Sequence, residues 1–512
     1  MGVLKYILFA LALFASPVSA ADIFITQAGT VGDTGVDEAN AHSAAWFNAN
    51  ATGGNTYHLC GTFTGTAGST MLDVPTGSEG NVLTVLFEDD AVLTAPYWGG
   101  TYDGAINVKT KSYVTIDGGT NGLIKNTANG SALANQQDSK AVYVVDSSHI
   151  EIKNLTVQDI YNQCGAEEVC TDTGGAGTSG IQVRGDSTNV LVHDNTVTAA
   201  RAGIILSFMD CDTIDIYSNT ISDTCWGIAA VGGTGILGDA ATNVRIYGND
   251  ITGGSNWQKP TSYHSNGIVA WAPRGGDIFS PDIYNNYIHG NLGASATGYI
   301  YCTYGGGTGD TSTSCNIYNN ILIKEGTTNW IIATGSDTSG HKIYNNTIIG
   351  DTTASGQGLY LSGTDLTIKN NIISTVKYAM TIVGGAAACL TASDNNLFYN
   401  INAGQASSMF GGDEFRDWEE WQALGFDLNS YYENPNLTGS YHLQSTSGNA
   451  IDKGATLDAA YNTDKDGNAR GSGAAWDIGA YEYRVVPNIS NFGTGAITIT
   501  PNNAGAIAVT PY

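Results

Sequence analysis

The chain has 512 residues, of which 13% are charged, and its 20 basic and 47 acidic residues give a net charge of −27. This charge repels nucleic acids and anionic lipids at long range, so it argues against a nucleic-acid-binding role. The length would allow several compact domains, but no linker-like break interrupts the glycine-rich middle of the chain, which favours one elongated domain.

The first twenty residues predict an export signal. Met1–Ala20 contains one lysine, an apolar run and the small-residue pattern Val18-Ser19-Ala20, and it is too short to span a bilayer. We expect cleavage after Ala20 and a secreted, extracellular protein, with the periplasm or the cell surface as alternatives. No later stretch has the roughly 18 apolar residues that a membrane helix needs, so we expect no transmembrane segment.

Eight cysteines in an exported chain predict disulfide bonds. Three pairs each flank a short loop: Cys164 with Cys170, Cys211 with Cys225, and Cys302 with Cys315. Free buried thiols are the alternative for each pair. No cysteine and histidine spacing is typical of a zinc site.

The first predicted element is a short helix at residues 37–50, "DEANAHSAAWFNAN". Ala41, Ala44, Ala45 and Trp46 would form one apolar face of this helix. We expect the helix to cap the N-terminal end of the strands that follow.

A repeat dominates the middle of the chain. The stretch "HKIYNNTIIG" at residues 341–350 has several near copies, and its second asparagine aligns with equivalent residues in steps of 24 to 37 residues. The aligned residues are Asn195, Asn219, Asn249, Asn286, Asn320, Asn346, Asn371 and Asn396. A fixed slot with insertions of variable size is typical of a solenoid.

Each copy alternates apolar and polar residues, which predicts a strand, and a second strand such as "SGIQV" or "NGIVA" precedes each asparagine. Two or three short strands per repeat predict an all-β fold, a single-stranded parallel β-helix. We expect each aligned asparagine to adopt a left-handed turn while its amide bonds to the neighbouring coils.

A tyrosine precedes the asparagine pair in five consecutive coils. These residues are Tyr217, Tyr247, Tyr284, Tyr318 and Tyr344. The rings would stack along the outside of the solenoid. We expect Tyr247 and Tyr284 to bind substrate by packing on sugar rings, and stabilisation of the sheet alone is the alternative.

The longest insertions are candidate functional loops. The first contains Glu167, Glu168 and Asp172, which would hold calcium or simply form a solvated acidic loop. The second, at residues 256–276, concentrates basic and aromatic residues in a chain poor in bases.

The second loop has the residues that β-elimination in an acidic polysaccharide requires. That reaction needs a base for the proton beside the uronate carboxylate and a cation to neutralise the carboxylate. The candidate catalytic residues are Lys259, Tyr263 and His264 as the base and Arg274 as the neutraliser, with Trp257 and Trp271 as sugar-binding platforms. An ordinary polar loop with packed tryptophans is the alternative.

Further candidates lie in the preceding coils. Arg184 and Arg201 sit beside upstream strands and would bind substrate carboxylates. In "FMDCDTIDIY" the alternation places Asp210 and Asp212 on one face, the minimum for a shared metal ion, so Ca²⁺ is a candidate cofactor.

The repeat fades after Asn396. We expect a short helix at residues 413–424, a closing element at residues 450–483 that covers the last coil, and a β-rich tail at residues 484–512. In the closing element Arg470 lies within reach of Asp477 or Glu482, which predicts a salt bridge. The tail repeats itself at ten residues, which predicts a hairpin or the start of a stalk.

The "IYNN" copies and "VTIDGGTNGLIKNTANG" at residues 114–130 make the chain resemble the pectin-lyase-like family of right-handed parallel β-helix proteins. The resemblance covers about residues 22–482 and implies a right-handed solenoid at residues 21–483. It does not extend to the Gly-His-Gly element and paired aspartates of the galacturonan hydrolases in this family, or to a clean match for the calcium strand of its pectate lyases.

The function we expect is binding, and cleavage by β-elimination, of an extracellular polysaccharide that contains uronate. The alternative is a non-catalytic surface, adhesion or carbohydrate-binding protein of the same fold. The expected partner is a polysaccharide, and the expected state is a monomer.

Overall fold

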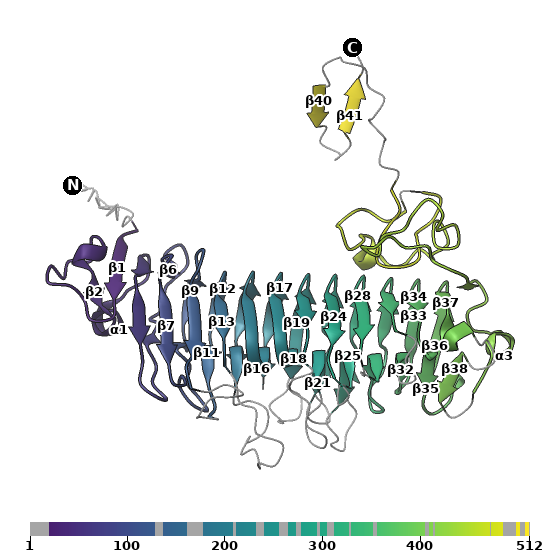
Figure 1. Ribbon diagram of the computed structural model, residues 1–512, viewed down its shortest axis with the longest axis horizontal. Coiled ribbons are helices and arrows are strands. Elements are labelled where there is room, and N and C mark those ends of the chain that lie inside the picture. Colours follow the sequence, from purple (N-terminus) through teal and green to yellow (C-terminus); the bar gives the residue numbers. More distant parts are fainter. Residues whose placement is uncertain are drawn as a thin grey trace, which may run out of the picture.

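The computed structural model describes residues 20–128, 137–160, 178–207, 211–231, 240–254, 265–272, 278–293, 297–304, 312–326, 329–351, 356–404, 409–412, 415–471, 473–484, 498–501 and 507–510. These residues form an elongated solenoid of short parallel strands, stacked coil upon coil from the purple N-terminal end to the green C-terminal end (Figure 1). The chain is a right-handed parallel β-helix, which confirms the predicted fold class.

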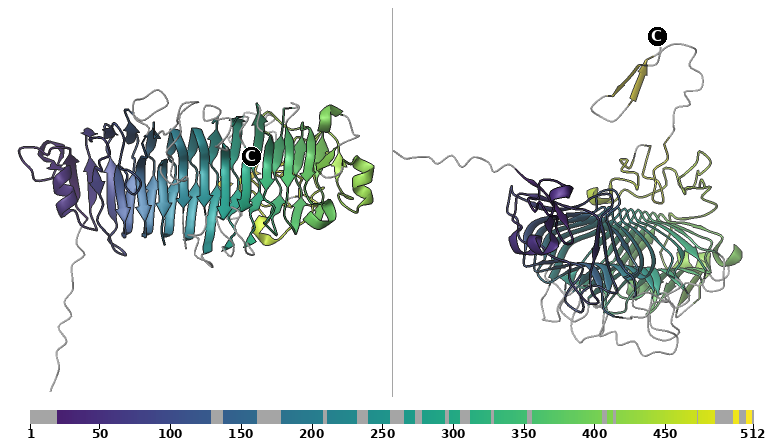
Figure 2. Two further views of the ribbon diagram at one scale, coloured as in Figure 1. Left: turned by 90° about the horizontal axis from the view of Figure 1, so that it is seen from below. Right: turned by 60° about the vertical axis from the view of Figure 1, so that its left-hand side comes forward.

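The first sheet receives one strand from each coil (Figure 2). Its strands, in spatial order, are β2 (His42–Ser43), β1 (Asp22–Thr26), β3 (Thr56–Leu59), β6 (Leu83–Phe87), β9 (Ser112–Asp117), β12 (Ser148–Lys153), β15 (Thr188–His193), β17 (Asp212–Tyr217), β19 (Ala240–Tyr247), β23 (Asp282–Tyr284), β27 (Asn316–Tyr318), β30 (Lys342–Tyr344), β33 (Leu366–Lys369) and β36 (Leu390–Asp394), with β22 (Ile278–Phe279) and β26 (Ser312–Thr313) at its edge.

The second sheet contains the remaining strands of each coil, and its long strands β16 and β18 continue through the bend of the coil. Its strands are β4 (Thr62–Thr64), β5 (Leu72–Asp73), β7 (Val92–Ala95), β8 (Ile106–Lys109), β10 (Leu123–Asn126), β11 (Lys140–Val145), β13 (Thr156–Gln158), β14 (Ser179–Arg184), β16 (Thr196–Ser207), β18 (Thr220–Val231), β20 (Asp250–Thr252), β21 (Asn266–Ala272), β24 (Tyr287–Asn291), β25 (Gly298–Tyr304), β28 (Ile321–Glu325), β29 (Trp330–Thr334), β31 (Thr347–Ile349), β32 (Gln357–Leu361), β34 (Ile372–Ser374), β35 (Tyr378–Ile382), β37 (Leu397–Tyr399), β38 (Phe410–Gly412) and β39 (Tyr431–Tyr432).

Inward-facing residues stack on their equivalents in the next coil. In the first sheet the register aligns Ile246, Ile283, Ile317 and Ile343, and all four are fully buried. Each such side chain contributes roughly 1.5–3 kcal/mol of apolar burial. The period-two alternation in the sequence therefore marks one continuous core.

The predicted asparagines form an unbroken hydrogen-bonded ladder inside the solenoid. From Asn195 to Asn371, each Nδ2 donates to Oδ1 of the next asparagine at 3.0 or 3.1 Å. The same Oδ1 atoms also accept from backbone N–H groups. The side chains are at most 1% exposed, so the ladder satisfies polar groups that are cut off from water.

The residue before each ladder asparagine adopts the left-handed conformation. The prediction that the ladder asparagine itself both forms this turn and bonds to neighbouring coils is therefore wrong for the turn. These corner residues are Asp194 (φ 55°), Ser218 (φ 53°), Gly248 (φ 64°), Asn285 (φ 57°), Asn319 (φ 55°), Asn345 (φ 54°), Asn370 (φ 59°) and Asn395 (φ 54°). Two adjacent asparagines recur because one turns the chain and the other bonds along the axis.

The N-terminal helix is shorter than predicted. Residues 38–40 form a 3₁₀ turn, and helix α1 covers only Ala44–Asn50, where Ser43 caps its first turn by accepting from Trp46 N at 3.0 Å. Ala44 and Phe47 are the buried residues of α1, whereas Ala45 is exposed. The interruption occurs because residues 42–43 join the first sheet as β2.

The expected C-terminal helix is also short. Helix α3 covers Trp418–Ala423 and begins at a capping box formed by Asp417 and Glu420. It lies at the end of the solenoid (Figure 1). Residues 413–414, where we expected the helix to begin, lie outside the described residues.

The predicted closing element at residues 450–483 contacts the last coil, where Asn395 Nδ2 donates to Lys453 O at 3.0 Å, and it also extends over earlier coils. Residues 433–483, which we call the return segment, lie along the side of the solenoid above its C-terminal half (Figures 1 and 2). Corner asparagines hold it there: Asn370 exchanges two hydrogen bonds with Ala455, and Asn319 Nδ2 donates to Thr463 O at 2.8 Å. The predicted salt bridge exists, because Arg470 Nη1 lies 3.2 Å from Glu482 Oε1 and both side chains are buried.

One of the three predicted disulfides is present and one is wrong. Cys302 and Cys315 are bonded. No disulfide joins Cys211 to Cys225: Cys211 is buried in the main core immediately before β17, whereas Cys225 belongs to a small separate cluster beside Trp226. Cys164 and Cys170 lie outside the described residues, as do residues 1–19 of the expected export signal.

In the tail, β40 (Thr498–Pro501) pairs antiparallel with β41 (Ile507–Thr510), consistent with the predicted hairpin. Within the described residues, no helix combines the length and the hydropathy that a membrane span requires.

Candidate functional site

The outward tyrosines of the first sheet, which we call the tyrosine ridge, stack so that neighbouring rings cover each other's faces. Ring centroids of Tyr217, Tyr247, Tyr284 and Tyr318 follow one another at 4.8–5.0 Å with interplanar angles of 2–9°. Each inner ring therefore presents only its edge and hydroxyl to solvent. The predicted packing of sugar rings on Tyr247 and Tyr284 does not fit this geometry, and like-pair stabilisation of the sheet does.

The return segment covers the C-terminal part of the same ridge. Tyr461 packs edge-on against Tyr318 and Tyr344 at 4.9 and 5.1 Å, and Trp476 completes the cluster. Burial raises the pKa of Tyr344 and, more strongly, that of Tyr318. The C-terminal part of the tyrosine ridge is therefore buried between the solenoid and the return segment.

The side chains of β11, β14, β16, β18, β21 and β25 that point away from the main core form a second layer, which we call the outer face, and its central members Gln182 and Ile205 are at most 1% exposed. Parallel register places Tyr143 beside Gln182, then Ile205, Ala229 and Val269 on successive strands. Because the strands alternate, Arg184 and Trp271 are two residues further along and also point outward.

A cationic group occupies the N-terminal part of the outer face. The Arg184 guanidinium lies 5.2 Å from the Tyr102 ring centroid, and the amines of Lys140 and Lys109 lie 5.5 and 5.7 Å from that of Tyr143. Arg184 also forms a side-chain hydrogen bond with Tyr143. Three of the chain's 20 basic residues therefore gather around one buried tyrosine.

The three cations differ in accessibility. The side chain of Lys109 is 37% exposed and pairs with Asp103, and Arg184 is half-buried. Lys140 is fully buried and donates to the carbonyls of Gly100 and Thr101 at 2.7 and 3.2 Å. Burial lowers the pKa of Lys140 to about 8, so the amine stays largely protonated at neutral pH.

An aromatic group follows on the next coils. Arg201 is 4% exposed and its guanidinium lies 4.9 Å from the Trp226 ring centroid. Trp226 and Trp271 are both half-buried and pack against one apolar cluster with Tyr301. Arg201 therefore contacts Trp226, and the predicted site residue Trp271 packs further along the same apolar cluster.

The four predicted catalytic residues, Lys259, Tyr263, His264 and Arg274, and the predicted sugar-binding Trp257 lie outside the described residues. They belong to residues 255–264 and 273–277, which flank the described residues of β21 on both sides, and β21 contains Trp271.

The described residues give no carboxylate metal site around Asp212. Its Oδ1 accepts from Thr242 Oγ1 at 2.6 Å and Asn243 Nδ2 at 2.8 Å, and these hydrogen bonds lower its pKa. Asp210, Glu167, Glu168 and Asp172 lie outside the described residues. The single group of three potential ligands found within the described ranges is Cys302, Cys315 and His341, whose sulfurs are joined in a disulfide.

Sequence reasoning missed Lys140, Tyr143, Gln182 and Trp226. Gln182 is fully buried and donates from Nε2 to Ser207 Oγ at 2.8 Å, and its buried Oε1 has no hydrogen-bond partner among the described residues. Aligning "KAVYVV" with "SGIQVR" would have placed Tyr143 beside Gln182, because the two strands share one register.

Comparison with known proteins assigns no family: no family model matches, and none of the curated proteins does. Among solved structures, a rhamnogalacturonan lyase is 10% identical, with 74% of this chain and 87% of that one covered and a TM-score of 0.46. Pectate lyase Pel9A is 13% identical (91% and 97% covered, TM-score 0.44), and the PL6 family alginate lyase AlyGC is 11% identical (93% and 60% covered, TM-score 0.46). Similarity at this level carries no statement about activity, which has to follow from the chain's own residues.

Proposed function

We propose that the chain binds an acidic, uronate-containing polysaccharide along the outer face and cleaves it by β-elimination outside the cytoplasm. The observation that supports this is the group of Lys109, Lys140 and Arg184 around Tyr143 in a chain of net charge −27. Local cations overcome the repulsion that the rest of the molecule exerts on an anionic polymer. Carboxylates are the ligands that guanidinium and ammonium groups prefer.

The neighbouring aromatic group supports a sugar ligand. Trp226 and Trp271 are half-buried on adjacent strands, and each combines an apolar ring with a polar N–H. A polymer lying across the stacked strands would meet cations on the first coils and tryptophans on the next ones. Strands spaced roughly 4.8 Å apart suit a ligand that repeats along its length.

The residues that we assign to the β-elimination step flank β21 in the sequence. Lys259, Tyr263 or His264 would remove the proton beside the carboxylate, and Arg274 or Arg184 would stabilise the charge of the enolate. The enolate would then expel the glycosidic oxygen from the β carbon as the carbon–carbon double bond forms, and the protonated base or water would return a proton to that oxygen. Calcium held by Asp210 and Asp212 is an alternative neutraliser.

A non-catalytic binding protein is the second candidate. One observation favours it: Lys140 and Tyr143 are too buried to act as a base on a polymer, and the Lys140 amine already donates to two carbonyls. The same outer face would then bind the polysaccharide without cleaving it.

The experiment offers the mature chain a panel of uronate polysaccharides, with calcium and then with a chelator. It records the ultraviolet absorbance of the unsaturated product and measures binding separately. We expect Arg184→Gln to weaken binding about tenfold or more and His264→Gln to reduce cleavage at nearly unchanged binding. Exposed Arg484 provides the matched control, Arg484→Gln.

The outcomes separate the two candidates. Cleavage that His264→Gln abolishes supports the lyase, whereas binding without cleavage supports the binding protein. Binding that Arg184→Gln leaves unchanged would exclude the outer face as the site in either case.

A further inference from the structure

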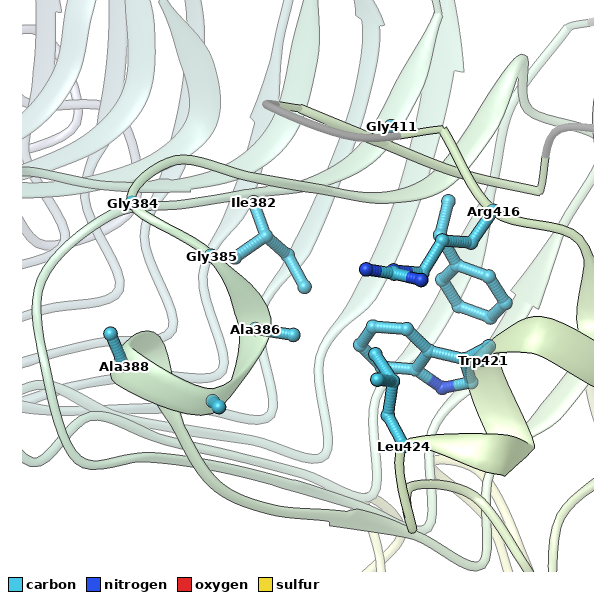
Figure 3. Close-up of a pocket in the computed structure, with 11 residues that line it drawn as sticks. Ile382, Gly384, Gly385, Ala386, Ala388, Gly411, Arg416, Trp421 and Leu424 are labelled. Carbon is cyan, nitrogen blue, oxygen red and sulfur yellow. The ribbon is translucent and has the colours of Figure 1, made fainter.

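The chain reverses its direction at the C-terminal end of the solenoid and continues as the return segment. There Trp421 of helix α3 lies opposite Ile382 and the loop that leads into helix α2 (Ala386–Cys389), around a cavity of about 430 Å³ (Figure 3). Trp421 Nε1 donates to Asp427 Oδ2 at 2.8 Å, and Asp427 also accepts from the last ladder asparagine. The return segment therefore starts from a point that the core of the solenoid holds in place.

Three side chains of the return segment form a series of hydrogen bonds in the order serine, histidine, aspartate. Ser440 Oγ lies 3.1 Å from His442 Nδ1, and His442 Nε2 lies 3.0 Å from Asp466 Oδ2. Ser440 and Asp466 are exposed and the His442 side chain is 38% exposed, so small molecules can reach all three. A nucleophile within reach of a base, and a base held by a third group, is the arrangement that nucleophilic catalysis requires.

The hydroxyl of Thr438 sets the direction of these hydrogen bonds. Thr438 Oγ1 accepts from Ser440 N at 3.3 Å and from His442 N at 3.0 Å, which occupies both of its lone pairs. The hydroxyl of Thr438 can then only donate, and Ser440 Oγ lies 3.1 Å away. The hydrogen of Ser440 is left for His442 Nδ1, which accepts it when His442 Nε2–H donates to Asp466.

Buried groups orient the base and its carboxylate. The His442 ring stacks on Tyr481 with centroids 3.7 Å apart and an interplanar angle of 15°. Tyr481 is 8% exposed and belongs to one apolar cluster with Ile321 of the solenoid. Asp466 N donates at 3.0 Å to the buried carboxylate of Asp464. The positions of His442 and Asp466 are therefore tied to the packed part of the protein.

Backbone groups around Ser440 match the charges that form during acyl transfer. The Ser440 carbonyl oxygen lies 3.1 Å from His442 Nδ1, a contact that is favourable once the ring has taken up a proton. An oxyanion needs N–H donors beside the nucleophile. Gly439 N donates to no other group in the described part of the chain, and the space beside its Cα is open among the same residues. The N–H that precedes the nucleophile is therefore available to a carbonyl oxygen.

We propose that Ser440 and His442 form a hydrolytic site for small neutral carboxylic esters, with Asp466 and Thr438 as positioning residues. Ser440 Oγ attacks the ester carbonyl carbon while its proton passes to His442 Nδ1, and the carbonyl oxygen becomes an oxyanion. The carbonyl then reforms, the alcohol leaves with the proton from Nδ1, and the acyl group remains on Ser440. Water attacks this acyl group by the same route, which releases the carboxylic acid and restores the serine hydroxyl.

Neutral esters fit this site better than anionic ones. Asp466 carries a negative charge next to the reacting groups, and the net charge of −27 repels anionic molecules at longer range. Acetyl esters of alcohols and of sugars belong to the neutral class. The site shares no residue with the outer face and does not rest on the proposed polysaccharide activity.

The test incubates the full mature chain with p-nitrophenyl acetate, records the release of p-nitrophenol and maps the acylated residue by mass spectrometry. We expect Ser440→Ala and His442→Asn to lower kcat/KM about hundredfold or more. Ser445→Ala is the matched control, because Ser445 is exposed on the same segment, and it should act like the parent. Phenylmethylsulfonyl fluoride should modify Ser440 in the parent chain and leave it unmodified in His442→Asn.

The variant Asp466→Asn separates a positioning role from a merely structural one. It should lower kcat about tenfold or more with KM nearly unchanged, and its unfolding midpoint should match that of the parent. Because imidazole accepts a proton only in its neutral form, kcat of the parent should rise between about pH 5 and pH 8. The proposal is overturned if the parent does not hydrolyse the ester above the buffer rate, if Ser440→Ala matches the parent, or if the acyl group and the sulfonyl label are found on another residue.

Discussion

Asn396 Nδ2 donates to Asp427 Oδ1 at 2.8 Å, and this contact ends the asparagine ladder on a buried carboxylate. Asp427 also accepts from Ser393, Ser430 and the Trp421 indole. At the other end, the backbone N of Leu155 donates to Asn195 Oδ1 at 3.0 Å. A ladder of amides needs a donor at one end and an acceptor at the other, and the chain provides both.

The ladder should be a major source of stability. Asn320 is fully buried, donates to Ile283 O and Asn346 Oδ1, and accepts from both the backbone and the amide of Asn286. We expect Asn320→Ala to leave several buried polar groups without partners and to lower the free energy of unfolding by about 2–4 kcal/mol. Urea unfolding followed by circular dichroism measures this change.

The control for this measurement is Asn329→Ala, because Asn329 is exposed. It should change the free energy of unfolding by about 0.5 kcal/mol or less. Equal effects of the two substitutions would show that the ladder adds no stability beyond that of an ordinary surface asparagine.

The corner residues give a second prediction. Ser218 is exposed and has φ 53°, in a slot where other coils use asparagine, aspartate or glycine. Ser218→Val should cost about 1–2 kcal/mol, because a β-branched residue is strained in the left-handed region, whereas Ser218→Asn should be neutral or slightly stabilising. Thermal unfolding of both variants distinguishes them, and identical midpoints would contradict the role assigned to this slot.

The fold could be predicted because its cause is local and repeated. The spacing of "IYNN" predicts coils, and the ladder confirms it residue by residue. The division of roles within each asparagine pair was missed, although the sequence marks it: the second slot is asparagine in all eight coils, whereas the first also holds Asp194, Ser218 and Gly248. The place of the return segment could not be read from the sequence: Lys465 bonds to Asn285 across 180 residues, and no periodic signal marks such a contact.

The candidate site was predictable only in part. Arg184, Arg201 and Trp271 were predicted because they are basic or aromatic residues in the strands that precede the ladder asparagines. All three lie on the outer face. Lys140 and Trp226 were missed because their importance depends on neighbours in other coils. Tyr247 and Tyr284 suggested a sugar platform, but stacking at the strand spacing hides their ring faces.

The buried His341 gives a prediction about pH. Burial lowers its pKa from 6.5 to about 4, and its Nδ1 accepts from Cys315 N at 2.9 Å. As the pH falls from 6.5 towards 4, the unfolded chain binds a proton that the folded chain does not. The stability from this residue is therefore fully present above about pH 6.5 and is lost by about pH 4, a difference of roughly 3 kcal/mol.

Urea unfolding at pH 7, 5.5 and 4.5 tests the role of His341 through the variant His341→Asn, which keeps a hydrogen-bond acceptor. The variant should lose less stability than the parent across this range, while the carboxylates titrate alike in both chains. His149→Asn is the control, because His149 is exposed and its φ of 56° suits asparagine. Parallel pH profiles for the parent and His341→Asn would refute the assignment.

The ion pair of the return segment gives the last prediction. Arg470 Nη2 also donates to Asn319 Oδ1 at 2.8 Å, and Glu482 Oε1 also accepts from Asp477 N at 2.9 Å. Arg470→Met leaves the buried Glu482 carboxylate without its cation, which should cost about 3–5 kcal/mol, whereas Arg470→Met with Glu482→Leu removes both charges and should cost less. Release of the segment uncovers Tyr318 and Tyr344, so hydrogen exchange and limited proteolysis should show a looser segment in the single variant than in the double variant. The reverse order would mean that the contact of Glu482 with the backbone, and not its pairing with Arg470, holds the segment against the solenoid.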